Sequence, residues 1–321
     1  MTASNTAVYT NSDDYRAGIG DASVDLVLAG PGDFKARLTW LKLDHLHAFR
    51  CRENIPRIAY ISLAPTRIFV SFPLTSSSAT VWNGVELQLG DIVLHSRGER
   101  GHQWTKGISQ WALVSLPACQ FADYCKALAE LDLPDPPVGR ILRLPPSAAV
   151  RLRRLHSKAC NLAETKPEIF AHQEAARAVE QEFIYMLVNC LAAGDAPSHP
   201  VIRQRHAEVM TGFEEMLRSD FDQLPSISGF CAAVGVPERT LRACCIKFLG
   251  LCPSQYIRLR RLNLVRAELR RANPATATVA QIALHHQFSE LGRFVAAYRA
   301  LFGERPSETL RRAQANFAGI A

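Results

Sequence analysis

The chain has 321 residues, of which 48% are hydrophobic and 21% are charged, so its length and composition suit about two globular domains with ordinary cores. The sequence shows no signal peptide, no apolar stretch of 18 residues and no C-x-x-C pair among its nine cysteines, which disfavours membrane-spanning, secreted disulfide-linked and cysteine–zinc proteins and predicts a cytoplasmic protein. Residues 203–321 hold 17 Lys and Arg against 10 Asp and Glu, whereas residues 1–202 hold 20 of each, so the net charge of +7 predicts a polyanion partner for the C-terminal part.

Residues 24–116 are predicted to be mostly β-strand. Seven short runs rich in β-branched and aromatic residues are separated by Gly, Pro, Asn and Ser. These runs are residues 36–41, 58–63, 68–72, 79–82, 84–89, 92–94 and 111–116. Asn83-Gly84 predicts a tight hairpin, because both residue types accept the positive φ angles of a type I′ turn.

Two helices are predicted after a proline-rich connector at residues 134–146. The first spans about 148–164 and the second about 166–193. The second carries an apolar stripe formed by Phe170, Ala175, Val179, Phe183, Met186, Leu187 and Cys190. The stripe is equally compatible with packing on its own domain and with a homodimer seam.

Residues 195–202 are predicted to be a linker, because residues 192–200 are rich in Ala, Gly, Pro and Ser. This boundary gives an N-terminal β-rich domain at 1–194, with helices at about 148–193, and a second domain at 203–321.

The second domain contains two tandem copies of one helical unit. Four residues of the first copy recur 53 positions later: Leu241, Gly250, Pro253 and Ser254 become Phe294, Gly303, Pro306 and Ser307. Each copy also has apolar residues at i, i+3, i+4 and i+7, namely Leu241, Cys244, Cys245 and Phe248, then Phe294, Ala297, Tyr298 and Leu301. That spacing predicts one buried face on each helix.

Each copy is predicted to be a helix-turn-helix motif, at about 226–249 and 278–302. A short apolar segment precedes a turn, and the helix after the turn ends at a glycine, Gly250 or Gly303. Ser289 is a suitable N-cap for the second of these helices.

Residues 254–272 are predicted to form one connector helix, which Asn273-Pro274 ends. A helix of about 20 residues is about 30 Å long, close to the roughly 34 Å between successive major grooves on one face of DNA. One molecule is therefore expected to place both reading helices on one side of a duplex. The connector's arginines suit phosphate contacts or a solvated face equally: Arg258, Arg260, Arg261, Arg266, Arg270 and Arg271.

These motifs resemble the C-terminal domain of AraC/XylS-type transcriptional regulators, over about residues 205–315. The second copy carries the closer resemblance, through Ile282-Ala283, Phe288-Ser289, Leu291-Gly292-Arg293-Phe294, Tyr298-Arg299 and Phe302-Gly303-Glu304-Arg305-Pro306-Ser307. The resemblance implies a domain of seven helices, in which the helices that begin at Glu238 and Glu290 enter the major groove. Residues 87–94 are similar to a turn of a cupin-type β-barrel, which many members of this family carry as an effector domain. The expected fold is thus a multidomain α+β protein, with an N-terminal cupin-like barrel plus helices and a C-terminal all-α domain.

Transferred by position, the family's DNA-contacting face falls on eleven residues. On the first reading helix these are Arg239, Thr240, Arg242, Ala243 and Ile246; on the second they are Leu291, Gly292, Arg293, Val295, Ala296 and Arg299. Arginine suits bidentate pairing with guanine, and apolar residues suit thymine methyl groups. The sequence departs from the family pattern at Ala243, Cys245, Gln287 and Ala296, where a basic residue, an aromatic residue, glycine and arginine are usual.

Cupins often hold a metal through a His-x-His pair, so metal binding in the barrel is one hypothesis for this sequence. The candidates are His45 and His47, with Glu53, His95 and His102 as further ligands. The spacing to Glu53 does not fit the pattern, so no metal and no cofactor are expected. If the barrel is a sensor, a subset of its aromatic residues is expected to line the lumen, drawn from Trp40, Phe49, Tyr60, Phe69, Phe72, Trp82, Trp104 and Trp111.

The sequence thus predicts a bacterial-type, non-enzymatic regulator that reads double-stranded DNA and senses a small molecule or dimerises through its N-terminal domain. RNA polymerase is a further partner if the protein is an activator, and no membrane partner is expected. Two alternatives stay open, a constitutive DNA-binding protein without an effector and a cupin-type metalloenzyme with an appended helical domain.

Overall fold

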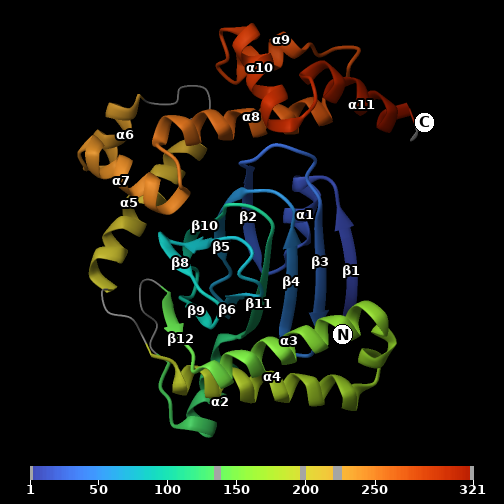
Figure 1. The fold of residues 1–321 in the computed structure, drawn as a ribbon, viewed down its shortest axis with the longest axis vertical. Coiled ribbons are helices and arrows are strands. Elements are labelled where there is room, and N and C mark those ends of the chain that lie inside the picture. Colours follow the sequence, from blue (N-terminus) through green and yellow to red (C-terminus); the bar gives the residue numbers. More distant parts are fainter. Residues whose placement is uncertain (1–2, 134–138, 196–199, 220–225, 319–321) are drawn as a thin grey trace.

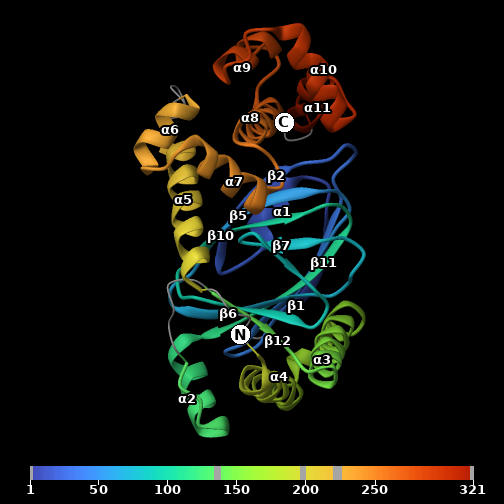
Figure 2. The same cartoon turned by 60° about the vertical axis from the view of Figure 1, so that its left-hand side comes forward.

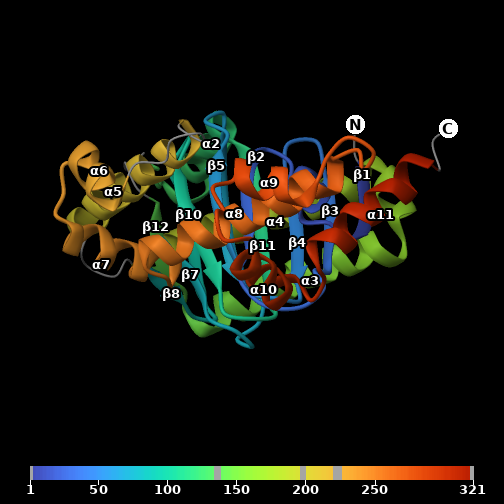
Figure 3. The same ribbon diagram turned by 90° about the horizontal axis from the view of Figure 1, so that it is seen from above.

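The computed structural model describes residues 3–133, 139–195, 200–219 and 226–318. Two facing β-sheets occupy the middle of the molecule, with helices on opposite sides of them (Figure 1). Helices α3 and α4 lie on one side, and the C-terminal helices lie on the other, so that α8 and α10 lie in front of the strands when the molecule is seen from above (Figure 3). The predicted α+β architecture, with a β-rich N-terminal part and a helical C-terminal part, is confirmed.

The first sheet has seven antiparallel strands. In spatial order they are β1 (Ala3–Tyr9), β3 (Ala36–Lys42), β4 (His47–Glu53), β11 (Ser109–Pro117), β6 (Arg67–Pro73), β9 (Asp91–His95) and β12 (Arg140–Arg143). The second sheet has five antiparallel strands, β2 (Ala22–Leu28), β5 (Arg57–Leu63), β10 (Arg100–Thr105), β7 (Thr80–Trp82) and β8 (Val85–Leu87). These two sheets occupy the place of the predicted barrel, and their likeness to a cupin stays a prediction.

The strand region is longer than the predicted 24–116. It begins with β1 at Ala3 and ends with β12 at Arg143. All seven predicted runs contain a strand. The Asn83-Gly84 turn is confirmed, with φ angles of 44° and 77° and with Trp82 paired to Val85 across the hairpin. Strands β1, β2, β4, β10 and β12 lie outside the predicted runs, and β10 and β12 carry charged or polar residues where an apolar alternation would have indicated a strand.

The aromatic residues expected in the lumen divide among three cores. Phe49, Phe69, Trp82 and Trp111 are buried between the sheets, and Trp40 packs against them. Phe72 belongs instead to the core between the first sheet and helices α3 and α4, and Trp104 packs against the core of the C-terminal helices. The cavity left between the sheets is about 20 Å³, lined partly by Trp82, Trp111 and His95, which leaves room for about one water molecule.

Within its described residues, the N-terminal part has four α-helices, α1 (Ser12–Gly18), α2 (Ala118–Ala129), α3 (Pro146–Thr165) and α4 (Gln173–Ala193). The prediction that a helix begins near Lys166 is wrong, because a 3-10 helix at Pro167–Ala171 precedes α4. Lys166 has a φ of −145°, as the ring of Pro167 disfavours helical geometry before it. The apolar stripe of α4 packs within its own domain, so homodimer formation stays a prediction.

The C-terminal part has seven helices in the described residues. They are α5 (Pro200–Ser219), α6 (Ile227–Val234), α7 (Glu238–Leu249), α8 (Pro253–Arg271), α9 (Val279–His285), α10 (Leu291–Phe302) and α11 (Pro306–Ala318). Of the predicted linker, residues 196–199 lie outside the described residues, Asp195 forms a β-bridge with Arg143, and Pro200 already begins α5. Among the described helices, none combines the length and apolar character needed to cross a bilayer.

Candidate nucleic-acid interface

The first helix-turn-helix motif consists of α6 and α7. Gly235 ends α6 in the left-handed conformation, with φ 70°, and the N–H of Val236 bonds back to the carbonyl of Cys231 at 3.0 Å. Pro237 caps α7, Glu238 places a carboxylate near the positive end of the helix dipole, and Gly250 ends the helix with φ 72°. The predicted stripe of α7 is buried, so its other face is available.

The second motif consists of α9 and α10. The side chains of Thr278 and Gln281 form a capping box that begins α9. Gln287 makes the turn in the left-handed conformation, with φ 64°, at the position where the family usually has glycine. Its side-chain oxygen accepts a hydrogen bond from Arg261 at 2.7 Å, which helps to hold this strained residue. The N-cap of α10 is Glu290, so the assignment of Ser289 as the N-cap is wrong.

The eleven predicted DNA-contacting residues form the outward faces of α7 and α10. Thr240 is half-buried, and the other ten are exposed. In the described part of the chain, the guanidinium groups of Arg239 and Arg242 form no hydrogen bond or ion pair. Arg293 is paired only with Glu290 on the same surface, at 2.9 Å, and such exposed pairs are weak enough to exchange for another partner. Both faces therefore present donors and apolar groups to solvent.

Two connector arginines, Arg260 and Arg266, are largely buried in ion pairs, which corrects the expectation of phosphate contacts or a solvated face for these two. Arg271 is 65% exposed, so a solvated face holds for it. On α8, Arg260 pairs with Glu214, Arg266 with Glu304 and Arg271 with Asp13. Arg270 donates to the side-chain oxygen of Asn11 at 2.9 Å. Arg258 is exposed and keeps either role.

A buried polar cluster joins the two parts of the molecule around Glu214 of α5. The ring Nε2 of His102, on β10, lies 3.0 Å from one carboxylate oxygen of Glu214. Arg260 Nη1 donates to the other oxygen at 2.5 Å, and the Tyr256 hydroxyl donates to the first. Burial alone would raise the pKa of Glu214, but the bond from His102 and the charge of Arg260 outweigh it and lower this pKa to about 2.

The lowered pKa of Glu214 predicts an acid-sensitive fold. Its carboxylate stabilises the folded state fully above the unfolded-state pKa of 4.5, and this contribution is lost as the pH falls toward the folded pKa of about 2. The contribution is on the order of 3 kcal/mol. We expect urea unfolding from pH 6 to pH 3 to show a steeper loss of stability for the wild type than for Glu214→Gln. Parallel pH profiles would contradict this assignment.

Further contacts fix the C-terminal helices against the second sheet (Figure 2). Asn263 of α8 exchanges two hydrogen bonds with the backbone of Leu28, at 2.9 and 3.1 Å. The tip of the β7–β8 hairpin meets α7 so closely that a Cβ on Gly84 would lie 2.7 Å from Cγ of Lys247. The Arg218 guanidinium stacks over the Tyr60 ring at 4.5 Å, which places Tyr60 at this junction rather than in the lumen.

The histidines that are candidate metal ligands form hydrogen bonds with other side chains instead. His47 bonds to Asp21 at 2.5 Å, His95 bonds to Ser71 and Glu99, and His102 bonds to Glu214. His45 lies beside Asp44, and Glu53 accepts from Arg57, Tyr15, Ser109 and Trp111. Across the described residues, no three His, Cys, Asp or Glu side chains come together as a metal site would require. No local pattern points to the Glu214 cluster, because its members are far apart in the chain.

Comparisons with known proteins match the helical part of the chain to a protein family and to curated relatives. Residues 230–312 match the family model described as a helix-turn-helix domain. The chain is 35% identical over 118 residues to the XylDLEGF operon transcriptional activator 3 of Pseudomonas putida, a match that covers 36% of each protein. The chain thus spans about a third of the length of this curated relative.

Two solved structures are also similar to this chain. A probable AraC family transcriptional regulator from Rhodopseudomonas palustris is 32% identical, with 33% of this chain and 96% of that chain covered and a TM-score of 0.30. The AraC-like transcriptional activator CuxR is 17% identical, with 83% of this chain and 96% of that chain covered and a TM-score of 0.44.

Proposed function

Because residues 230–312 belong to the helix-turn-helix family of AraC/XylS-type regulators, we propose that this protein is a transcription regulator that reads double-stranded DNA with α7 and α10. The observation that carries the proposal is the outward face of these two helices. Each helix buries one apolar stripe and leaves its opposite side exposed. Arg239, Arg242 and Arg293 are the proposed base-reading residues, with phosphate contact as their second role.

We further propose that the N-terminal part controls DNA binding in response to a small molecule. The contacts between the sheets and α5, α7 and α8 support this, because a ligand that favours one arrangement of the two parts shifts DNA affinity whenever the arrangements differ in DNA affinity. RNA polymerase as a partner in activation is a proposal that follows the names of the relatives as transcriptional activators. A homodimer is a separate proposal that the names do not address. The same names support a protein without enzymatic activity.

DNA binding by purified full-length protein tests the regulator proposal. We expect one sequence to be enriched from a pool of random duplexes, with affinity that falls steeply as salt rises. Arg239→Ala and Arg293→Ala should each weaken binding to that sequence by about 1–3 kcal/mol and relax its specificity.

Arg151→Ala is the matched control, because it removes the same charge from an exposed site on α3, away from both reading helices. The DNA affinity of this variant should equal that of the wild type. If no sequence is enriched at any salt concentration, the regulator proposal fails.

A further inference from the structure

A groove crosses the first sheet at the ends of strands β1, β3, β4 and β11. It measures about 450 Å³. Four residues form one row along it, because Val8 is paired with Arg37, Arg37 with Arg52, and Arg52 with Gln110. Residues directly opposite each other in antiparallel strands have their side chains on the same face. All four side chains therefore line the groove together.

The groove lies on the face of the first sheet that is turned away from the second sheet. Leu38, which follows Arg37 and so points the other way, is buried between the two sheets. Helix α3 covers the next row of the outer face, where Arg50 is buried and pairs with Glu164 of α3 at 2.6 Å. The helix ends at Thr165. This end of the outer face is therefore left uncovered by α3.

The positive charge of the groove has no counter-charge of its own. Three cations line it, Lys35, Arg37 and Arg52, and within the described residues their side chains form no hydrogen bond or ion pair. The Nε atom of Arg52 is buried without a hydrogen-bond partner. Burial, and then the charge of Arg50, lower the pKa of Arg52. Like charges directly opposite each other destabilise a sheet, so Arg37 and Arg52 are unfavourably placed unless an anion lies between them.

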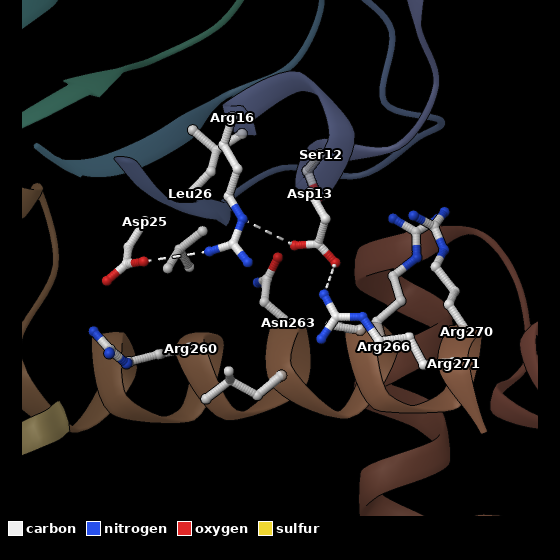
Figure 4. Close-up of a pocket in the computed structure, with 13 residues that line it drawn as sticks. Ser12, Asp13, Arg16, Asp25, Leu26, Arg260, Asn263, Arg266, Arg270 and Arg271 are labelled. Carbon is white, nitrogen blue, oxygen red and sulfur yellow. Dashed lines mark hydrogen bonds and ion pairs between the residues drawn. The ribbon is translucent and has the colours of Figure 1, made fainter. Parts of the chain in front are cut away.

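The acidic residue that lines the groove is already engaged. Glu53 is 2% exposed, and its two carboxylate oxygens accept hydrogen bonds from Tyr15 and Arg57, each at 2.9 Å. The cavity between α1 and α8 is different, because there Asp13 pairs with both Arg16 and Arg271 (Figure 4). The cations of the groove therefore call for an anion from outside the chain.

The dimensions of the row fit an extended peptide. Neighbouring strands are about 4.8 Å apart, so the three intervals from Val8 to Gln110 span about 14 Å, and their midpoint falls between Arg37 and Arg52. An extended chain rises about 3.3 Å per residue and points alternate side chains to one side, so its residues i, i+2 and i+4 span about 13 Å. An acidic residue at i+2 then lies between the two guanidinium groups, with its same-side neighbours over Val8 and Ile108.

We propose that this groove binds an extended segment of a partner protein, in which an acidic residue has apolar residues two positions before it and two positions after it. The acidic side chain bridges Arg37 and Arg52. The apolar side chains cover Val8 and Ile108, which are 50% and 61% exposed. A small anion would satisfy the arginines but leave both apolar ends of the groove in water. The inference goes beyond the proposed function, because it adds a protein partner and uses no residue of α7 or α10.

Fluorescence anisotropy with full-length protein tests the groove. The probe is a fluorescein-labelled peptide with the core Val-Ser-Glu-Ser-Val. We expect saturable binding that weakens as salt rises. Arg37→Gln and Arg52→Gln should each weaken this binding at least about tenfold, since a charge-assisted bond is lost. Neither substitution should lower the melting temperature, because each removes one of two opposed like charges.

Arg154→Gln is the matched control, because it removes the same charge from an exposed position of α3 that does not line the groove. Its affinity for the probe should match that of the wild type. Two further peptides test the spacing. Val-Glu-Ser-Ser-Val turns the acidic side chain away from the sheet, and Ser-Ser-Glu-Ser-Ser lacks the apolar groups. Both should bind more weakly than the probe.

Absence of saturable probe binding overturns the inference, as does unchanged binding in both groove variants or equal weakening in Arg154→Gln. Equal binding of the peptide without valine would show a site for small anions and also overturns it. If Arg52→Gln does not fold, Arg37→Gln decides, because Arg37 is exposed. Arg37→Gln should still enrich the same DNA sequence as the wild type, so a failure of the groove and a failure of the regulator proposal are distinguishable.

Discussion

Replacing Glu214 by Ala is expected to lower the free energy of unfolding by about 3–5 kcal/mol. The substitution leaves the Arg260 guanidinium, the His102 ring and the Tyr256 hydroxyl without the carboxylate that all three contact. A buried charge that loses its partner is costly, because no water replaces the lost bonds. Urea unfolding at pH 7, followed by tryptophan fluorescence, measures the change.

Glu215→Ala provides the matched control for this experiment. Glu215 is the next residue on α5, and its ion pair with Arg100 is about half exposed on both sides. Exposed pairs contribute about 0–1 kcal/mol, so this variant should remain close to the wild type. Equal losses in the two variants would show that the buried cluster does not hold α5 to the sheet.

Phe294→Ala is expected to have an effect of similar size, about 3–5 kcal/mol. Phe294 is 1% exposed at the centre of the second motif. Its ring lies 5.0 Å from the ring of Phe288 and 5.7 Å from the ring of Tyr298, so truncation opens a hole between α10 and its turn. We expect α10 to lose protection from amide hydrogen exchange and sequence-specific DNA binding to disappear.

Val295→Ala is the control for Phe294→Ala, because it removes a side chain that faces outward at the next position of α10 and so tests DNA contact without disturbing the fold. Val295 is 36% exposed on the outward face of α10, so its truncation should change stability by no more than about 0.5 kcal/mol. Any loss of DNA affinity in this variant then reflects a lost contact. Native-like exchange protection of α10 in Phe294→Ala would refute the packing argument.

The sequence predicted the helical motifs well, because their signals are local. A helix with a buried face must repeat apolar residues every three or four positions, and Gly250 and Gly303 mark the helix ends because both adopt left-handed φ angles, 72° and 71°. Asn83-Gly84 identified its hairpin for the same kind of reason. Each of these signals depends on neighbours within one turn of the chain.

The junction could not be predicted, because its partners are distant in sequence. His102 and Glu214 are 112 positions apart, and Asn11 and Arg270 are 259 apart. Strand β10 was missed for the same reason, since His102 and Gln103 are buried polar residues that look like a loop until their partners are known. The connector arginines suited phosphate contact and a solvated face equally, because the acids that pair with three of them lie far away in the sequence, on α1, on α5 and in the turn before α11.

The close fit of Gly84 against α7 has a mechanical consequence. A Cβ at position 84 would lie 2.7 Å from Cγ of Lys247 and 3.0 Å from ring atoms of Phe248, closer than ordinary van der Waals contact allows. Packed surfaces of this kind exist in a few discrete arrangements and do not deform gradually. Any side chain at position 84 would therefore push the hairpin tip away from α7, so glycine at this one position sets how closely the sheets and the first reading helix approach each other.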